Sequence, residues 1–303
     1  MSATLELVAG DARVVLAPAI GGAIAAFTLA GTDVMRPMPA GAGDVRQAAA
    51  YPLVPYSNRI RDARLTVGGV EHVLARNFGD EPGSIHGVGW QRAWQVVHHD
   101  ARSAALALAH GARGDAARAW PWRFDATQTF ALVAPDARAT LGVTLTIRNR
   151  DDVAFPFGLG WHPYFPRDAA TTLAFDAGGV WRNDANHLPL AHVPIPPAWN
   201  FAQPRAIGAG ALDNVFTGWR GHATLATPGH ALATTLDADS ACRCVVVYAP
   251  PGRGFVAIEP VTHETDAFNR EARGAADTGT RWLPPGAAFS CTMRITAMHS
   301  PAA

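Results

Sequence analysis

The stretch Leu141-Gly-Val-Thr-Leu-Thr-Ile-Arg148 decides the fold of this chain. Its apolar residues occupy every second position, and glycine, threonine or arginine fills the positions between them. Successive side chains of a β-strand point to opposite faces, so this period of two predicts a strand with one buried and one exposed face. Residues 289–296, Phe-Ser-Cys-Thr-Met-Arg-Ile-Thr, repeat the alternation near the end of the chain. Both stretches indicate a sheet that covers a core with one of its faces.

The rest of the chain extends this strand pattern. Cys244-Val-Val-Val-Tyr248 and Phe255-Val-Ala-Ile258 are apolar enough to predict strands buried on both faces. Turn signals containing Gly, Pro or Asp recur about every dozen residues, and no uninterrupted helical pattern exceeds about three turns. Residues 42–50 are the best candidate for a short helix. We therefore predict an all-β chain, a large antiparallel β-sandwich or barrel, that forms a single domain over residues 1–303.

Composition and charge exclude several kinds of protein. The chain has 303 residues, with 25 acidic and 25 basic side chains, and contains no lysine, so every basic side chain is arginine. Without a lysine amine there is no Schiff base, no pyridoxal linkage and no lysine in a phosphate loop. The zero net charge and the absence of a basic stripe argue against nucleic acid and anionic membranes as partners.

The sequence also bears on compartment and membrane. Residues 14–32 carry no charge, but Pro18 and the Gly21-Gly22 pair interrupt them, which predicts two buried strands joined by a turn rather than a membrane span. The N-terminal residues show no secretion signal. The cysteines are Cys242, Cys244 and Cys291, an odd number that indicates buried thiols in a reducing compartment. We therefore expect a cytoplasmic protein without a membrane partner.

Five segments place polar residues at the ends of apolar strands marked by Pro or Gly. They are residues 51–60 with Asn58 and Arg59, 84–90 with His86, 155–165 with His162, 212–216 with Asp213, and 255–260 with Glu259. A carboxylate that closes a buried strand must be desolvated or paired, so Glu259 is the strongest candidate for a functional group. His162, between a tryptophan and a proline, raises the same requirement. Each residue, taken alone, also has a plain structural explanation, such as a turn or a packing contact.

Taken together, the segments resemble the aldose 1-epimerase (galactose mutarotase-like) family, most closely its bacterial branch. The matching motifs are PYSNRI at 55–60, IHGVGW at 85–90, FGLGWHPYF at 157–165, LDNVF at 212–216, EPVTHETDAFN at 259–269 and LPPG at 283–286. They span most of the chain in the family's order. The resemblance implies a large antiparallel β-sandwich of the galactose mutarotase-like type, with a sugar bound in a cleft on one sheet.

The resemblance also implies a reaction, the interconversion of the α and β anomers of a free aldose by ring opening and closure. By resemblance, Glu259 is the catalytic base at O1 and His162 is the catalytic acid at O5. The residues it assigns to binding the sugar are Asn58, Arg59, His86 and Asp213. Trp161 either stacks on a sugar face or belongs to the core. A carboxylate and an imidazole suit acid–base catalysis, because their surroundings can place their pKa values on either side of neutrality.

Other functions stay open on the residues alone. A non-catalytic carbohydrate-binding or sensor protein would keep the sugar contacts and tolerate loss of Glu259 or His162. A glycoside hydrolase would need two carboxylates that flank the scissile bond. A hexose-6-phosphate epimerase would need several arginines that converge on a phosphate. We expect a monosaccharide as the partner, with no metal and no cofactor, because proton transfer alone suffices. Both a monomer and a homodimer fit the sequence.

Overall fold

In the computed structural model, which describes residues 4–299, the stretch at 141–148 lies within β13 (Arg138–Asn149). Its apolar side chains are fully buried, whereas the residues between them are half-buried or exposed. β13 pairs in antiparallel register with β27 (Ala288–His299), which contains the second alternating stretch. The predicted period of two is therefore confirmed, and burial of each large apolar side chain stabilises the fold by about 1.5–3 kcal/mol.

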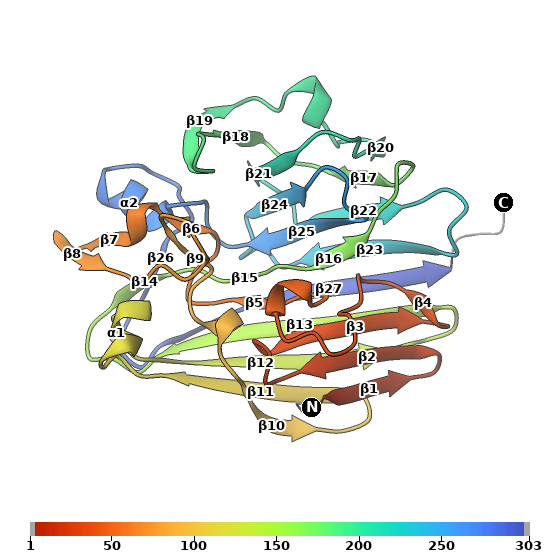
Figure 1. The fold of residues 1–303 in the computed structure, drawn as a ribbon, viewed down its shortest axis with the longest axis horizontal. Coiled ribbons are helices and arrows are strands. Elements are labelled where there is room, and N and C mark those ends of the chain that lie inside the picture. The colour runs from red at the N-terminus through yellow and green to blue at the C-terminus, as the bar shows by residue number, and fades with distance from the viewer. Residues whose placement is uncertain (1–3, 300–303) are drawn as a thin grey trace.

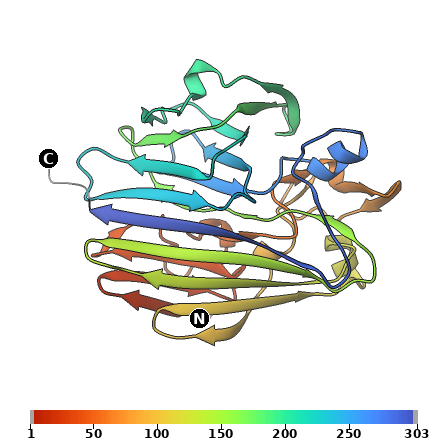
Figure 2. The ribbon, with the colours of Figure 1, turned by 180° about the vertical axis from the view of Figure 1, so that it is seen from behind.

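β13 and β27 form the middle of a nine-stranded antiparallel sheet, which is one layer of the molecule (Figure 2). In spatial order the strands are β10 (Gln95–His99), β11 (Ser103–His110), β12 (Phe124–Val133), β13, β27, β23 (Leu232–Ala238), β22 (His222–Ala226), β17 (Thr172–Phe175) and β20 (Arg205–Ala206).

The second layer contains an eight-stranded and a four-stranded sheet (Figure 1). The larger sheet has the order β19 (Pro189–Val193), β18 (Gly179–Asn183), β21 (Leu212–Thr217), β24 (Cys244–Ala249), β25 (Phe255–Val261), β15 (Gly160–Trp161) and β5 (Pro52–Leu53), with β16 (Tyr164–Pro166) also paired to β25. The smaller sheet comprises β1 (Leu5–Ala9), β2 (Ala12–Ala17), β3 (Ala23–Leu29) and β4 (Thr32–Asp33). The all-β fold with antiparallel sheets is thus as predicted.

Short elements cover one end of the layers. The two-stranded ribbons pair β6 (Arg59–Ile60) with β9 (Ser84–Ile85), β7 (Arg64–Val67) with β8 (Val70–Val73), and β14 (Phe155–Phe157) with β26 (Arg281–Leu283). The helices described within residues 4–299 are α1 (Asp115–Ala119), α2 (Ala267–Ala272) and the 3-10 turns η1 (Val45–Gln47), η2 (Arg61–Ala63), η3 (Gly89–Gln91) and η4 (Pro197–Trp199).

The helix predicted at residues 42–50 is wrong beyond the single turn of η1. Ala48 already has an extended main chain, and the N–H of Ala49 donates to the carbonyl of Ile24, whose own N–H donates to the carbonyl of Ala50. This pairing links the four-stranded sheet to the segment that leads into β5. Tertiary hydrogen bonds with β3 therefore override the local helical preference of the alanines.

The strands predicted to be buried on both faces are β24 and β25, and the prediction is confirmed. In β24, Val245 and Val247 pack into the core between the two layers, whereas Cys244 and Val246 pack into a second apolar cluster on the opposite face. That second cluster contains Tyr51, Trp90 and other residues from the segments around β5 and β9. The eight-stranded sheet is thus covered on its outer face by chain that carries several of the candidate site residues.

Two further expectations can be checked in this part of the chain. The uncharged residues 14–32 form β2 and β3 with a glycine-containing turn between them, as predicted. Cys242, Cys244 and Cys291 are buried free thiols. No helix within residues 4–299 has the length and apolar character needed to cross a membrane.

A close approach at Gly158 gives the first testable prediction. A Cβ added there would overlap the imidazole ring of His263, which is itself buried. Gly158→Ala is therefore expected to lower the free energy of unfolding by about 1–3 kcal/mol or more, as overpacking of a core does. Urea unfolding measures this. The matched control is Gly142→Ala in β13, where the nearest atom to an added Cβ is 3.8 Å away, and equal losses in both variants would contradict the prediction.

Candidate active site

Strand alternation places two carboxylates on the outer face of the eight-stranded sheet. In β25, Val256 and Ile258 pack into the core between the layers, so Glu259 faces the opposite side. In β21, Leu212 packs into the same core, so Asp213 also faces outward. Glu259 and Asp213 both line one cavity of about 500 Å³ on this face.

His162 follows β15 directly and contacts Glu259. Its Nε2 lies 3.1 Å from Oε1 of Glu259, and the two side chains are 8% and 3% exposed. The imidazole stacks on the ring of Tyr164 at 4.5 Å between centroids and lies 4.9 Å from the ring of Tyr51. The main-chain N–H of His162 donates to the carbonyl of Tyr51 at 3.0 Å. Aromatic packing and this hydrogen bond hold the imidazole against the carboxyl group.

Two hydrogen bonds join His86 and Asn58, one between their main chains and one from the main chain of Asn58 to the imidazole of His86. Both have left-handed φ angles, 60° and 58°. The N–H of His86 donates to the carbonyl of Asn58 at 2.9 Å, and the N–H of Asn58 donates to Nδ1 of His86 at 3.0 Å. Because Nδ1 accepts this bond, the neutral imidazole carries its proton on Nε2. His86 therefore has one N–H donor left for a ligand hydroxyl.

Two ion pairs contribute to the cavity wall. Arg59 contacts Glu81 through Nη2 at 3.0 Å and Nε at 3.3 Å, a bidentate arrangement that fixes the guanidinium plane. Asp213 contacts Nδ1 of His187 at 3.1 Å, and the hydrogen bond that this carboxylate accepts raises the pKa of His187. Asp213 is partly exposed at 25%, so it can bond to a ligand as well as to His187.

Candidate residues from distant parts of the chain line this one cavity. It is lined by Asn58, Arg59, His86, His162, Asp213 and Glu259, together with residues that include Arg36, Tyr51, Tyr164, His187 and Tyr248. Six of the seven predicted site residues therefore lie around one space. No group of three or more His, Cys, Asp or Glu within residues 4–299 has an arrangement that could hold a metal ion.

Burial sets the protonation of the central pair. It raises the pKa of Glu259 well above its usual value, an effect that Asp213 strengthens and Arg59 weakens. Burial also lowers the pKa of His162 to about 3, against which the charge of Asp213 acts. Both shifts favour the uncharged forms of the two groups, a protonated carboxyl group on Glu259 beside a neutral imidazole on His162. Oε2 of Glu259 is buried and has no hydrogen-bond partner among residues 4–299, which leaves it able to accept from a ligand hydroxyl.

The same motif that supplies Glu259 also contains residues with purely structural bonds. Nε2 of His263 accepts from the N–H of Ser57 at 3.0 Å, and its Nδ1 bonds the carbonyl of Glu264 at 2.6 Å. Asp266 accepts from the main-chain N–H of Arg61 at 3.1 Å. Both ring nitrogens of His263 are thus occupied by main-chain groups, and neither His263 nor Asp266 lines the cavity.

Trp161 does not lie in the cavity. Its side chain is 1% exposed and belongs to the core between the layers, whereas the adjacent His162 faces the cavity. Of the two expectations for Trp161, stacking on a sugar face is therefore wrong and a place in the core is correct, because the indole turns inward from β15. The aromatic rings that do line the cavity include Tyr51, Tyr164 and Tyr248.

Several cavity residues were not predicted from the sequence. Tyr51 and Tyr164 lie inside motif segments, and Tyr248 ends a predicted strand, so their positions carried a usable signal. Arg36 and His187 lie in connections without any motif. The guanidinium of Arg36 lies 3.8 Å from the ring centroid of Tyr164, and Nη2 donates to the carbonyls of Arg46 and Ala48. Only the folded arrangement brings these two side chains to the site.

The buried histidines give a prediction for stability against pH. Burial lowers the folded pKa of His162 to about 3 and that of His263 to about 4, and it also lowers the pKa of His86. Below the unfolded value near 6.5, the unfolded chain binds protons that the folded chain does not, so the free energy of unfolding falls as pH falls. The expected slope is roughly 1.4 kcal/mol per pH unit for each histidine. The raised pKa of Glu259 acts in the opposite direction, because the folded chain then binds a proton that the unfolded chain has released.

Urea unfolding at pH 7, 6 and 5 measures this slope. A net fall in the free energy of unfolding is expected between pH 6.5 and 5, because burial lowers the pKa of His110 as well as those of His86, His162 and His263, while Glu259 acts against them. The matched variant is His263→Gln, which removes a titrating ring outside the cavity. The free energy of unfolding of this variant is expected to fall less steeply with pH, by the roughly 1.4 kcal/mol per pH unit that one histidine contributes. A free energy of unfolding that stays constant from pH 7 to 5 would contradict the prediction.

Comparisons with known proteins agree with one another. The family model described as aldose 1-epimerase matches residues 3–296. The uncharacterized protein YphB of Escherichia coli (strain K12) is 31% identical over 262 residues, which cover 84% of this chain and 86% of YphB.

Solved structures extend the comparison to the whole fold. A protein from Escherichia coli K12, provisionally named an aldose 1-epimerase, aligns with a TM-score of 0.88 and 27% identity, covering 98% of this chain and 99% of that one. A homologue of GalM and aldose epimerase from C. elegans aligns with a TM-score of 0.80 and 16% identity, covering 99% of this chain and 100% of that one. The second similarity is one of fold alone.

Proposed function

Because this chain belongs to the aldose 1-epimerase family, we propose that it is a mutarotase, which interconverts the α and β anomers of a free aldose. The observation that carries the proposal is the 3.1 Å contact between Glu259 and His162 in the wall of a polar cavity. A carboxyl group and an imidazole in contact supply the base and the acid that ring opening needs.

Ring opening requires two proton transfers. The carboxylate of Glu259 takes the proton from the anomeric hydroxyl, C1=O1 forms, and the C1–O5 bond breaks as O5 takes a proton from the imidazolium of His162. Rotation about C1–C2 then presents the other face of the aldehyde. Closure reverses each transfer: His162 takes the proton from O5, O5 attacks C1, and O1 takes the proton from Glu259. Both residues return to their starting states, so no external acid or base is consumed.

The charge of Arg59 favours these roles. The reactive form needs a carboxylate and an imidazolium, which arise when the shared proton moves from Glu259 to His162. Arg59 lowers the pKa of Glu259 and so assists that transfer, whereas Asp213 raises the pKa of both Glu259 and His162. Burial opposes the transfer, and a sugar hydroxyl that donates to Oε2 stabilises the carboxylate further.

The remaining polar groups suit the hydroxyls of a sugar. Nε2–H of His86 and the guanidinium of Arg59 are donors, and the carboxylate of Asp213 is an acceptor. Arg59 and Asp213 each keep a fixed partner, Glu81 and His187, so their orientation is set before a ligand binds. Such prior ordering lowers the entropy lost on binding and positions the anomeric carbon at the Glu259–His162 pair.

A panel of freshly dissolved pure anomers tests the proposal. Polarimetry or NMR follows α-D-glucose, α-D-galactose and other aldoses toward their anomeric equilibrium with and without the protein. We expect saturable acceleration for at least one free aldose. Binding of the sugars without any acceleration would instead indicate a carbohydrate-binding protein, and release of phenol from aryl glycosides would indicate a hydrolase.

A further inference from the structure

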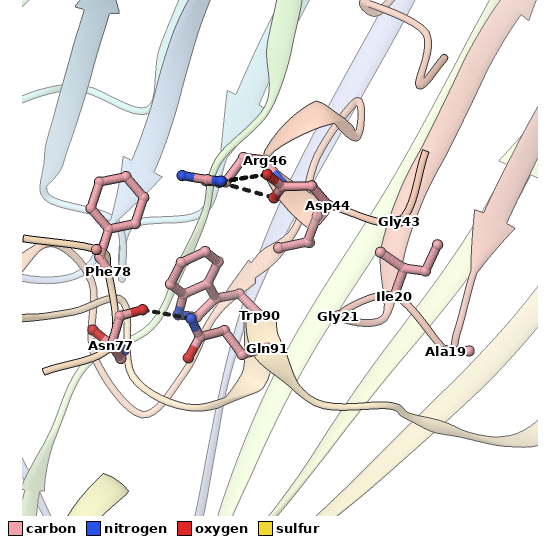
Figure 3. Close-up of a pocket in the computed structure, with 12 residues that line it drawn as sticks. Ala19, Ile20, Gly21, Gly43, Asp44, Arg46, Asn77, Phe78, Trp90 and Gln91 are labelled. Carbon is pink, nitrogen blue, oxygen red and sulfur yellow. Dashed lines mark hydrogen bonds and ion pairs between the residues drawn. The ribbon is translucent and has the colours of Figure 1, made fainter. Parts of the chain in front are cut away.

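A second cavity, of about 440 Å³, lies beside the candidate active site (Figure 3). The two cavities have Asp44, Arg46 and Phe78 in common, so these side chains stand between them. The rest of the second cavity is lined by connections and 3-10 turns that have no part in the proposed reaction, including Ile20, Gly43 and, in η3, Gln91. Each cavity has the size of an ordinary small-molecule site.

The shared wall is held in one orientation. Asp44 accepts from Nε of Arg46 at 2.9 Å and from Nη2 at 2.5 Å, and it also accepts from the main-chain N–H of Arg46 at 3.0 Å as the cap of η1. The guanidinium lies 5.2 Å from the ring centroid of Phe78. Although ordered, the side chains of Arg46 and Asp44 remain 54% and 39% exposed. Their polar atoms are therefore fixed yet accessible from the cavities.

The chemistry of this wall matches a sugar unit. A carboxylate and a guanidinium side by side accept from and donate to neighbouring hydroxyls, and a half-buried phenyl ring such as Phe78 can pack against the C–H face of a pyranose. Gln91 adds an amide whose Nε2 donates to the carbonyl of Asn77 at 2.7 Å, which fixes its position at the edge (Figure 3). Ile20 supplies apolar surface across the cavity.

We propose that the second cavity is a saccharide subsite, so that the protein acts on the reducing end of a disaccharide or longer saccharide. The reducing aldose occupies the cavity of Glu259 and His162, the attached sugar unit occupies the second cavity, and the Asp44–Arg46 pair contacts both units. This inference rests on the proposed function for its catalytic part. Binding of the attached unit does not depend on it.

Gly43→Trp fills the second cavity selectively. Gly43 lines that cavity and not the active site, it is exposed, and an added Cβ meets no atom within 4 Å. The matched control is Gly111→Trp, at an exposed position on the loop after β11 where an added Cβ also meets nothing within 4 Å. Thermal unfolding checks that both variants fold.

The probes are α-D-glucose, α-lactose, β-maltose, melibiose and gentiobiose, each freshly dissolved and followed by polarimetry. For at least one disaccharide, kcat/KM is expected to exceed that for glucose by about tenfold, since contacts to a remote unit add binding energy. Gly43→Trp removes this excess and leaves the value for glucose unchanged, whereas Gly111→Trp changes neither. No disaccharide better than glucose, or an equal loss for glucose and disaccharides in Gly43→Trp, overturns the proposal.

A binding measurement separates the two proposals. Methyl glycosides of the same disaccharides cannot open their reducing-end ring, so calorimetry on them reports binding alone. Binding that is tighter than for methyl glucoside and is lost in Gly43→Trp supports the subsite even if no mutarotation is found, in which case only the proposed function fails. Equal binding of methyl glucoside and all methyl disaccharides by the wild type overturns the subsite and leaves the proposed function standing.

Discussion

Glu259→Gln is expected to lower kcat for mutarotation of α-D-glucose or α-D-galactose by about 10²–10⁴-fold, the range that a positioned general base contributes. The amide keeps the size and one oxygen of the carboxyl group but cannot take the proton from O1. Within residues 4–299, no other carboxylate pairs with His162, so none is placed to replace Glu259. Polarimetry of fresh anomers, with the spontaneous rate subtracted, measures the loss.

A second buried glutamate provides the control. Glu264 is 8% exposed, pairs with Arg270 and does not line the cavity. Glu264→Gln also removes a buried carboxylate, so any general effect on the fold appears in both variants. Provided that both remain folded by thermal unfolding, kcat is expected to fall only in Glu259→Gln. A Glu259→Gln protein that equilibrates anomers as fast as the wild type would refute the assignment of the base.

His162→Asn is the second large expected effect, with a loss in kcat of about 10²–10⁴-fold and little change in KM. The imidazole gives its proton to O5 only as the C1–O5 bond breaks, so its contribution appears in the transition state rather than in substrate binding. The asparagine amide retains a donor but does not transfer a proton. Initial rates over a range of aldose concentrations separate kcat from KM.

His86→Asn is the matched comparison, since both histidines are buried and lie 5.5 Å apart between ring centroids. His86 offers Nε2–H to a hydroxyl in the ground state and the transition state alike, so its loss is expected to raise KM more than it lowers kcat. If His162→Asn instead raised KM and left kcat unchanged, His162 would be a binding residue and the acid would have to be sought elsewhere.

Three of the four histidines that are buried within residues 4–299 show what the sequence could not tell. His86, His162 and His263 all lie in motif segments, His86 beside a glycine, His162 between a tryptophan and a proline, and His263 between a threonine and a glutamate. The structure separates them by their bonds: His263 is engaged on both nitrogens by the main chain, His86 on one, and His162 faces a carboxyl group. Apart from the carbonyl of Glu264, which adjoins His263, the partners of these rings come from residues far away in the sequence.

The face of a strand on which a side chain lies is predictable from the sequence only when the strand is long enough. In β25 the alternation of a seven-residue strand fixes the face of Glu259, and a reader of the sequence can count it. β15 has only two residues, apolar or small, so counting does not tell whether Trp161 or His162 turns toward the cavity. In the structure the indole of Trp161 packs in the core, so it does not make the contact with a sugar that was one of its two predicted roles.

The sequence by itself determined the strand pattern, the all-β class and six polar residues of the cavity. Local periodicity and motif chemistry depend on residues that are close together in the sequence, so they can be recognised without coordinates. Only the tertiary structure decided that Arg36 and His187 join the site, that Ala49 and Ala50 pair with Ile24 of β3 instead of continuing a helix, and that a second cavity adjoins the first. These features arise from contacts between segments distant along the chain, which have no local pattern to reveal them.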